Sequence, residues 1–313
     1  MPRRPPRRTL NILGRQADRV VNVPGKRKRA NPRTRTAAKS AERAMQRALT
    51  DAVDAAREHV NMRYLQSTIE RRDVTAAVDA LGWQEHGEPV LRAGHANAYQ
   101  RAFNVSADLE AKALGSQYSV INRHALTAME QAGARFVTSI GEGTRQELRA
   151  ILTDMLNRGL SVRDAAAQIR DRIGLTERLS RAVDNLAERL RAKGIAEDRI
   201  AKAVERKAKE KLLQRANLIA QTEAQNAAAA GQRASWAEAV TQGVLDADLA
   251  EQEWVTTSKP CPRICDPMNG QRVKVGQMFT TGDGRLVAGP GGDAHPGCLC
   301  TVVMYTNRKR AAA

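Results

Sequence analysis

The four cysteines of this 313-residue chain lie in two short clusters near its C-terminal end. The first cluster, CPRIC, holds Cys261 and Cys265, and the second, HPGCLC, holds Cys298 and Cys300 together with His295. Thiolates and imidazoles are the ligands that tetrahedral zinc prefers, and the spacing of the first pair is within the range that zinc sites use. The two clusters therefore offer five candidate ligands to a metal ion that needs four.

The pattern favours a structural zinc over a catalytic one. A catalytic zinc keeps an open coordination position beside a general base, and neither H-E-x-x-H nor H-x-E followed by C-x-x-C occurs in the chain. A nucleophilic pair of Cys298 and His295 is a further alternative, but a turn at Pro296 and metal ligation explain the same residues more simply. Two readings without a metal stay open, namely four reduced thiols or disulfides formed after cell lysis. We expect no catalytic residue.

The segment that must position these ligands differs in texture from the rest of the chain. After Trp236, glycine, proline and β-forming residues replace an alanine-rich periodicity, and EWVTTS, QRVKVGQMF, GRLVAG and CTVVMY predict short strands between turns. If CTVVMY begins a strand, Cys298 and Cys300 alternate with Leu299 and point to one face. Because residues 236–308 include few large apolar side chains, we expect a small α/β module that zinc holds together.

The remainder of the chain is predicted to be a helical body. Aromatic residues make up 3% of the sequence, while Ala, Leu, Ile and Val recur between charged residues, a pattern typical of packed helices. A helix or two is predicted from Ala44 to about Leu81, and a further helical stretch over residues 95–137. Thr144 and Glu147 have capping-box spacing, which predicts that another helix begins there.

A longer charged helical region is predicted over residues 177–233, with an interruption at Gly194. Glu205 and Lys209 form one of its acid-before-base pairs at i, i+4 spacing. A basic face on this region could contact nucleic acid, although runs of mixed sign are usually solvated faces. The expected organisation is a basic tail (1–43), an N-terminal helical region (44–138), a helical core (139–235), the Cys/His module (236–308) and a short tail (309–313).

Positive charge is concentrated at the start of the chain. The formal net charge is +17, and residues 1–40 hold thirteen Lys or Arg residues against the single acid Asp18. Such a proline-containing, highly charged segment cannot bury enough apolar surface to offset chain entropy, so it is predicted to be disordered when free. Its cations would bind phosphate backbones without sequence preference, whereas a solubilising tail or a sorting signal is the alternative. The residues assigned to nucleic-acid binding are Arg3, Arg4, Arg7, Arg8, Lys26, Arg27, Lys28, Arg29, Arg33 and Arg35.

Neither a secretory signal nor a membrane span is visible in the sequence. No apolar run approaches the roughly 18 residues that a spanning helix needs, so we expect a soluble protein with no membrane partner.

The order of the signals resembles a known family. GLSVRDAAAQIRDRIGLT, ANLIAQTEAQNAAAAGQ, EWVTTSKPCPRICDPMNGQ and HPGCLCTVV follow one another as in the phage head morphogenesis family of MuF-type minor head proteins, over roughly residues 140–305. The chain departs from that pattern at Gln221, where the family usually has Arg, at Ser258 and Lys259, where it usually has an acid, and in the wider spacing of the first cysteine pair.

The resemblance implies a non-enzymatic minor head protein of a tailed phage or prophage. It implies that the chain is in the host cytoplasm during assembly and inside the head in the virion, where it aids assembly or DNA ejection. The implied partners are the portal protein, the capsid interior, double-stranded DNA bound without sequence preference, and scaffolding protein. The alternatives are a cytoplasmic zinc-ribbon-like nucleic-acid-binding regulator, or an enzyme that acts through the region of His295.

Overall fold

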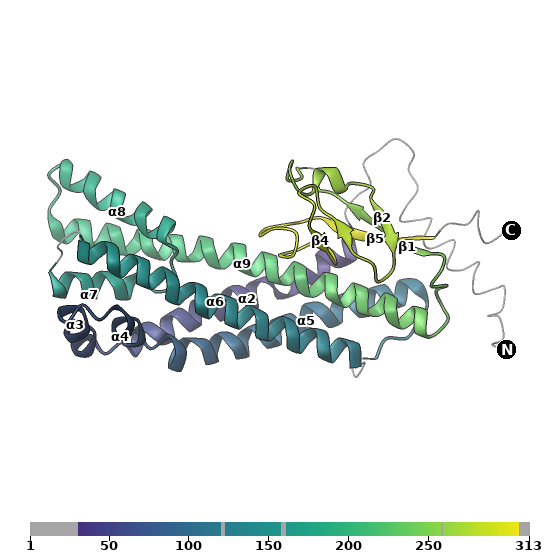
Figure 1. Ribbon diagram of the computed structural model, residues 1–313, viewed down its shortest axis with the longest axis horizontal. Helices are drawn as coiled ribbons and strands as arrows, with labels where there is room; N and C mark the ends of the chain where they lie inside the picture. The colour runs from purple at the N-terminus through teal and green to yellow at the C-terminus, as the bar shows by residue number, and fades with distance from the viewer. Residues whose placement is uncertain (1–30, 120–122, 158–160, 258, 307–313) are drawn as a thin grey trace. The chain divides into compact units, whose positions relative to one another are not determined.

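The alanine-rich periodicity folds into helices over most of the chain (Figure 1). The structure is a computed structural model that describes residues 31–119, 123–157, 161–257 and 259–306. A helical body followed by a small sheet region with a cysteine cluster is the fold class that the sequence predicted, and it is confirmed. The helices are α2 (Pro32–Glu58), α3 (Met62–Glu70), α4 (Val74–Asp79), the π-helical turn η1 (Trp83–Gly87), α5 (Glu88–Leu114), α6 (Arg123–Asn157), α7 (Val162–Asp171), α8 (Glu177–Ala192) and α9 (Glu197–Thr241).

The chain divides into two compact units. The sheet unit consists of the residues up to Arg43, Asn97–Glu130 and the chain from Leu218 onward, and the helical unit consists of Ala44–Ala96 and Gln131–Asn217. This division cuts across the predicted consecutive segments, because α2, α5, α6 and α9 each contribute residues to both units. The predicted segments stay a prediction.

In the helical unit, the turn after α7 packs closely on α2 and α9. Gly174, with φ of +83°, lies against Val53 and Leu212, so this position favours glycine both for its backbone conformation and for its lack of a side chain. Arg57 donates to the carbonyl of Asp171 (2.7 Å), and Arg215 donates to the carbonyl of Gly174 (2.6 Å). Two arginines thus satisfy the carbonyls at the C-terminal end of α7, where helices leave acceptors unpaired.

One predicted helix start is wrong. Thr144 is buried within α6, which begins at Arg123 and continues through the predicted boundary to Asn157. The partner of the predicted capping box, Glu147, instead accepts a hydrogen bond from the backbone N–H of Glu177 at the start of α8. The two residues therefore do not form the predicted local cap, because Thr144 is buried in the helix interior and Glu147 binds a residue distant in sequence.

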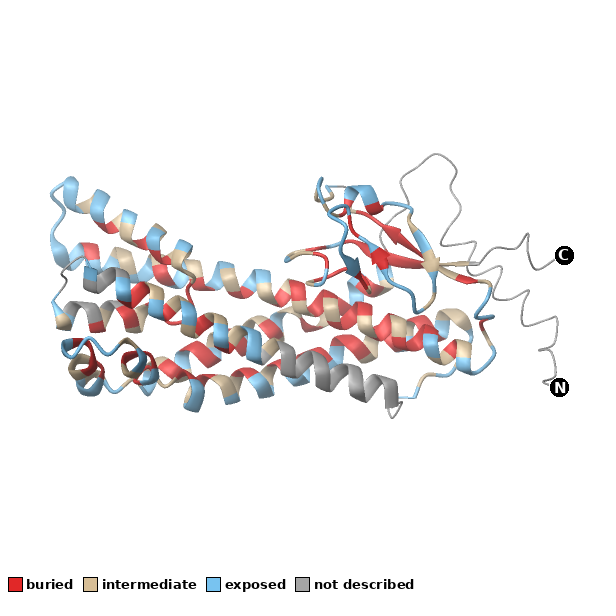
Figure 2. Cartoon of the chain, in the orientation of Figure 1, coloured by how far each residue is buried: buried red, intermediate tan, exposed pale blue. Residues whose placement is uncertain are grey.

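The sheet unit contains the predicted strands. β1 (Ala250–Val255) pairs antiparallel with β2 (Arg272–Lys274) on one side and β5 (Thr301–Thr306) on the other, and β3 (Phe279–Thr280) pairs with β4 (Leu286–Val287). A short 3₁₀ turn, η2 (Asp266–Met268), precedes β2. Figure 2 shows the buried residues gathered along β1 and β5 and on the facing surface of α9.

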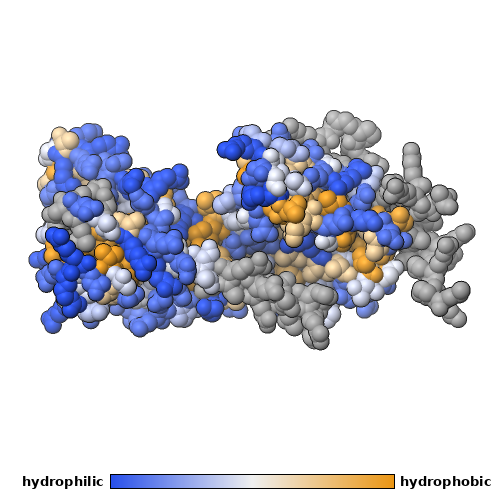
Figure 3. All heavy atoms as spheres, in the orientation of Figure 1, coloured by the Kyte–Doolittle hydropathy of each residue, from blue (hydrophilic) through white to orange (hydrophobic). Residues whose placement is uncertain are grey.

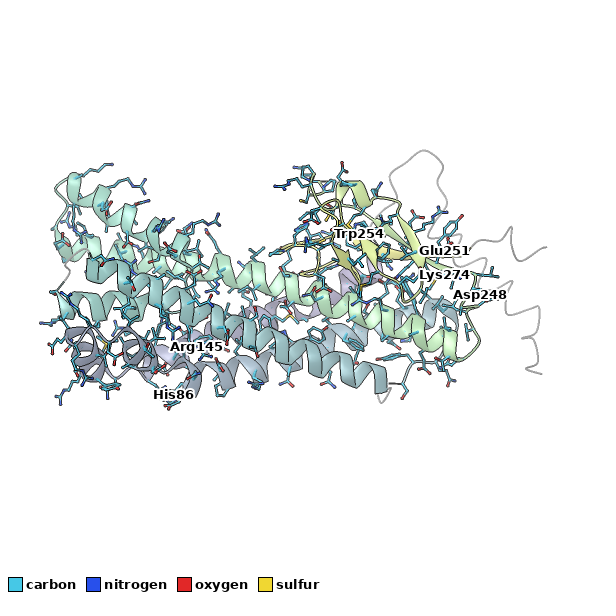
Figure 4. The ribbon with its side chains drawn as sticks, in the orientation of Figure 1. His86, Arg145, Asp248, Glu251, Trp254 and Lys274 are labelled. Carbon is cyan, nitrogen blue, oxygen red and sulfur yellow. The ribbon has the colours of Figure 1, made fainter. Side chains whose placement is uncertain are left out.

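Two aromatic residues fill the centre of this module. Trp254, labelled on β1 in Figure 4, meets Phe279 edge-on with ring centroids 5.3 Å apart. Trp236 of α9 belongs to the same buried cluster, together with Cys265, Cys298 and Cys300. The buried residues of this cluster all lie within residues 236–308, and Leu114 of α5 packs against it from outside that range.

The start of α2 is fastened to this module. The backbone N–H of Asn31 donates to Thr301 Oγ1 (2.8 Å), and its side-chain amide donates to the buried carboxylate of Glu110 (2.9 Å). Arg33 Nε (2.9 Å) and Trp236 Nε1 (3.2 Å) donate to the same carboxylate. Two donor residues at the start of α2 and one on α9 thus compensate the cost of burying this carboxylate.

The predicted tail is therefore too long at its C-terminal end. Residues 1–30 lie outside the described part, but the chain is helical from Pro32, with Ala37, Ala38 and Ala41 buried. Proline suits the first position of a helix, since its missing N–H would have no partner there.

Among the described residues, no helix combines the length and the apolar character needed to cross a membrane.

The contact between α5 and α9 generates a stability prediction. A Cβ atom added at Gly231 would overlap the backbone carbonyl of Phe103, which has no rotamer to relieve the clash. We expect Gly231→Ala to lower the free energy of unfolding by about 1–3 kcal/mol, measured by denaturant titration followed by circular dichroism.

Gly143 in α6 is the matched control, because a Cβ atom there meets nothing within 4 Å. Gly143→Ala should raise stability by up to about 1 kcal/mol through helix propensity. Equal responses of the two variants would contradict the close approach of α5 and α9.

Candidate metal centre

Three of the predicted ligands come together in the interior of the module. The Sγ atoms of Cys265, Cys298 and Cys300 all lie within 4.8 Å of one another, and the three residues are buried. Cys265 Sγ and Cys298 Sγ are 3.8 Å apart. Two sulfurs that each lie about 2.3 Å from one tetrahedral zinc are separated by about this distance, whereas a disulfide requires about 2 Å.

His295 lies beside this group, although its ring nitrogens are not within 4.8 Å of all three sulfurs. Its Nε2 atom is 3.1 Å from Cys265 Sγ, and its Nδ1 atom is 2.9 Å from the carbonyl oxygen of Pro296. A carbonyl can only accept, so the proton is assigned to Nδ1, which leaves the Nε2 lone pair directed towards Cys265 Sγ. Metal-binding histidines commonly use one nitrogen for the metal and the other for such a backbone contact.

The fifth candidate, Cys261, stays outside the three-sulfur group. It is partly buried against the same apolar cluster, and its carbonyl oxygen accepts from the backbone N–H groups of Cys265 (3.1 Å) and Asp266 (3.0 Å). Its role in the structure is to form the turn that presents Cys265. The chain thus brings three sulfurs together with one imidazole beside them, and these are donor types that tetrahedral zinc uses.

The three thiols differ in their proton affinity. Hydrogen bonds from Cys265 and Cys300, supported by backbone N–H groups of Gly291 and Cys300, lower the pKa of Cys298. The same interaction with Cys298, reinforced by Cys300 and by burial, raises the pKa of Cys265. For Cys300, the hydrogen bond with Cys265 lowers the pKa, but Cys298 and burial outweigh it and raise the pKa to about 11. Cys298 is therefore the thiol that loses its proton most readily, and a metal ion must displace the protons that Cys265 and Cys300 hold more tightly to bind all three sulfurs.

A polar stripe on α9 holds the loop that contains the ligands. Thr222 Oγ1 accepts from the backbone N–H of Gly297 (2.9 Å), and Asn226 Oδ1 accepts from that of Gly292 (2.6 Å). Gln225 Nε2 donates to the carbonyl of Cys300 (2.9 Å), and Gln232 Nε2 donates to that of Val302 (3.1 Å). Four side chains of one helix thus set the positions of the ligand loop and of β5.

The loop can approach α9 because it lacks side chains at the contact. Gly291 has φ of +121°, and a Cβ atom there would overlap the amide oxygen of Asn226. No other residue would fit this position without moving the loop away from the helix.

Sequence reasoning missed the stripe on α9. The signal was present, since Thr222, Gln225, Asn226, Gln232 and Trp236 recur at helical spacing within an otherwise alanine-rich segment. Polar residues at such positions would ordinarily be assigned to solvent, yet Gln225, Gln232 and Trp236 are at most 3% exposed.

Two assigned nucleic-acid-binding residues fall within the described part. Arg33 is ion-paired with the buried Glu110 and so has a structural role, and its assignment to phosphate binding stays a prediction. Arg35 is exposed on α2, as phosphate binding requires. The remaining assigned residues, Arg3, Arg4, Arg7, Arg8, Lys26, Arg27, Lys28 and Arg29, lie outside the described residues.

Comparison with known proteins leaves the site to be judged on its geometry. No family model, curated protein or solved structure matches this chain.

A pair of cysteine variants tests which sulfurs bind metal. We expect the purified chain to contain about one zinc per chain, Cys298→Ser to lose it, and Cys261→Ser to retain it, because only Cys298 belongs to the three-sulfur group. Elemental analysis of the purified variants measures this difference. Loss of zinc from both variants, or from neither, would contradict the assignment.

The pKa pattern also predicts how metal affinity depends on pH. Because the pKa values of Cys265 and Cys300 are raised, both thiols are protonated near neutral pH, and binding should release about two protons. The apparent zinc affinity should therefore fall as the pH is lowered from 8 to 6. Competition titration with a chromophoric chelator measures the slope, and a pH-independent affinity would exclude trithiolate ligation.

Proposed function

We propose that this chain is a minor head protein of a tailed phage or prophage, acting in head assembly or DNA ejection in association with the portal. The observation that carries the proposal is that the separate sequence signals of the MuF resemblance contact one another in a single module. Thr222 in the α9 signal bonds to Gly297 between His295 and Cys298 of the last signal.

The two ends of the stretch EWVTTSKPCPRICDPMNGQ also contact each other. Asn269, near its end, accepts from the backbone N–H (3.2 Å) and hydroxyl (3.0 Å) of Thr256, near its start. The backbone N–H of Gly270 donates to the carbonyl of Trp254 (2.8 Å). Residues up to 75 positions apart thus serve one local structure, which is what a family signature of structural origin requires.

Within this proposal, the centre is a structural zinc held by Cys265, His295, Cys298 and Cys300. Bound zinc would supply cohesive energy that the few large apolar side chains of the module do not. The exposed fractions of Cys265, Cys298 and Cys300 are 0%, 1% and 2%, so a substrate has no access to the sulfurs. A site whose three sulfurs are all buried supports a non-enzymatic role over the alternative of an enzyme acting through the region of His295.

The basic tail is the proposed contact with packaged DNA. Its last residue before α2, Asn31, is bonded to Thr301, the neighbour of Cys300. The residue that follows the ten Lys and Arg residues of positions 1–30 is therefore tied to the module next to the candidate centre. This connection supports a protein in which the module anchors a phosphate-binding arm.

Particle composition tests the proposal against the regulator alternative. Purified heads or procapsids should contain the chain at low copy number, and affinity isolation of the portal protein should recover it, both measured by quantitative mass spectrometry. Particles without the chain, together with a footprint on one preferred DNA sequence, would favour the zinc-ribbon-like regulator.

The tail makes a separate prediction about salt dependence. If about eight of its cations contact phosphates, log affinity for duplex DNA should fall against log salt concentration with a slope of about −7. Substituting Arg3, Arg4, Arg7 and Arg8 by Gln should reduce the magnitude of that slope by about 3.6. An unchanged slope would refute the assignment of the tail to phosphate binding.

A further inference from the structure

Outside the basic tail, the positive charge of the chain has one source. Residues 177–215, which span α8 and the first half of α9, hold twelve Lys or Arg residues against seven Asp or Glu residues. In residues 41–176 and in residues 216–313, the two signs balance. The whole excess of five positive charges beyond residue 40 therefore lies in this α8–α9 segment, which belongs to the helical unit.

Within the segment, cations are arranged on one face of each helix. Arg199, Lys202, Arg206 and Lys209 are exposed on α9 at positions i, i+3, i+7 and i+10, and so occupy one face over about 15 Å. On α8, the exposed residues at i, i+3 and i+11 are Arg178, Arg181 and Arg189. Figure 3 shows hydrophilic residues over much of α8.

Some of these cations are neutralised within the segment and others are not. Lys209 pairs with Glu205 (2.8 Å), and Arg181 pairs with Glu177. In the part of the chain that the structure describes, no carboxylate forms an ion pair with Arg199, Lys202 or Arg206. These three like charges are neighbours on the same helix face, where they repel one another.

We propose that this basic face of the α8–α9 segment is a second contact surface for the phosphate backbone of duplex DNA. The inference rests on the proposed function, since it assumes that the chain meets DNA, and it adds a contact that is independent of the tail. Over 15 Å, B-DNA presents about nine phosphate charges, enough to engage every cation of the α9 face.

The composition of the surface also specifies how it would bind. Residues 177–215 contain no Phe, Tyr or Trp, so the surface has no platform on which unpaired bases could stack. Lysine and arginine side chains on an exposed helix face can contact phosphates without reading base edges. Binding should therefore be independent of sequence and should favour duplex over single-stranded DNA.

The test compares two triple variants of the full-length chain. Arg199→Gln, Lys202→Gln and Arg206→Gln together remove the unpaired cations of the α9 face. Arg63→Gln, Arg92→Gln and Arg149→Gln remove three exposed arginines from α3, α5 and α6 with the same change in net charge. Binding to a 30-base-pair duplex of mixed sequence is measured between 50 and 300 mM salt, and thermal unfolding checks that each variant is folded.

The α9-face variant should reduce the magnitude of the salt slope by about 2.7, whereas the control variant should leave it unchanged. Its melting temperature should be equal to or above that of the parent chain, because repulsion between like charges is removed. Equal effects of the two variants, or no effect of the α9-face variant, would overturn the inference. If the tail substitutions alone reduce the slope, the proposed function stands without this surface, and if neither set does, both fail.

Discussion

Three thiols confined to one buried space, with an imidazole beside them, impose the strictest demand on this chain. Their protons and charges must be matched, because three neighbouring thiolates without a cation would repel each other in surroundings that screen poorly. The lowered pKa of Cys298 beside the raised pKa values of Cys265 and Cys300 is one response to that demand. A bound zinc ion is a better one, since it replaces two protons by a single divalent charge that all four ligands share.

The architecture around the centre follows from holding these four ligands in place. Cys265 comes from the turn that begins at Cys261, whereas the other ligands come from the loop before β5. The loop has glycines where it contacts α9. Side chains of α9 form hydrogen bonds with the backbone N–H and carbonyl groups of the loop and of β5. Nine alanines and Gly231 lie between Leu218 and Thr241 of that helix, so the loop and α5 can approach it closely. This is how a chain with 3% aromatic residues builds a well-packed unit.

Much of the fold could be predicted from the sequence, because helices and strands each require a characteristic spacing of apolar residues. The strands β1, β2, β4 and β5 coincide with the stretches that β-forming residues marked, and Gly174 and Gly194 fall in turns after helices with φ of +83° and +69°. Two boundaries could not be predicted. The burial of Thr144 depends on tertiary packing, and the helix at Pro32 depends on Glu110, a residue 78 positions away.

The sequence predicted the kind of ligand at the candidate centre, but not which of the cysteines come together there. Cysteine and histidine spacing indicates a metal, but it cannot distinguish Cys261 from Cys265, because either could face the second cluster until the turn between them is known. The burial of the polar stripe on α9 could not be predicted for a related reason. A glutamine on a helix is ordinary, and only the approach of a glycine-rich loop turns Gln225 and Gln232 into buried donors.

Zinc ligation by Cys265, His295, Cys298 and Cys300 is best tested by X-ray absorption spectroscopy at the zinc edge on the full-length protein. We expect a first shell of three sulfur atoms at about 2.3 Å and one nitrogen atom at about 2.0 Å. A shell of four sulfurs would place Cys261 in the centre and remove His295 from it. A folded protein with no zinc bound would contradict the claim that a metal ion holds the module together.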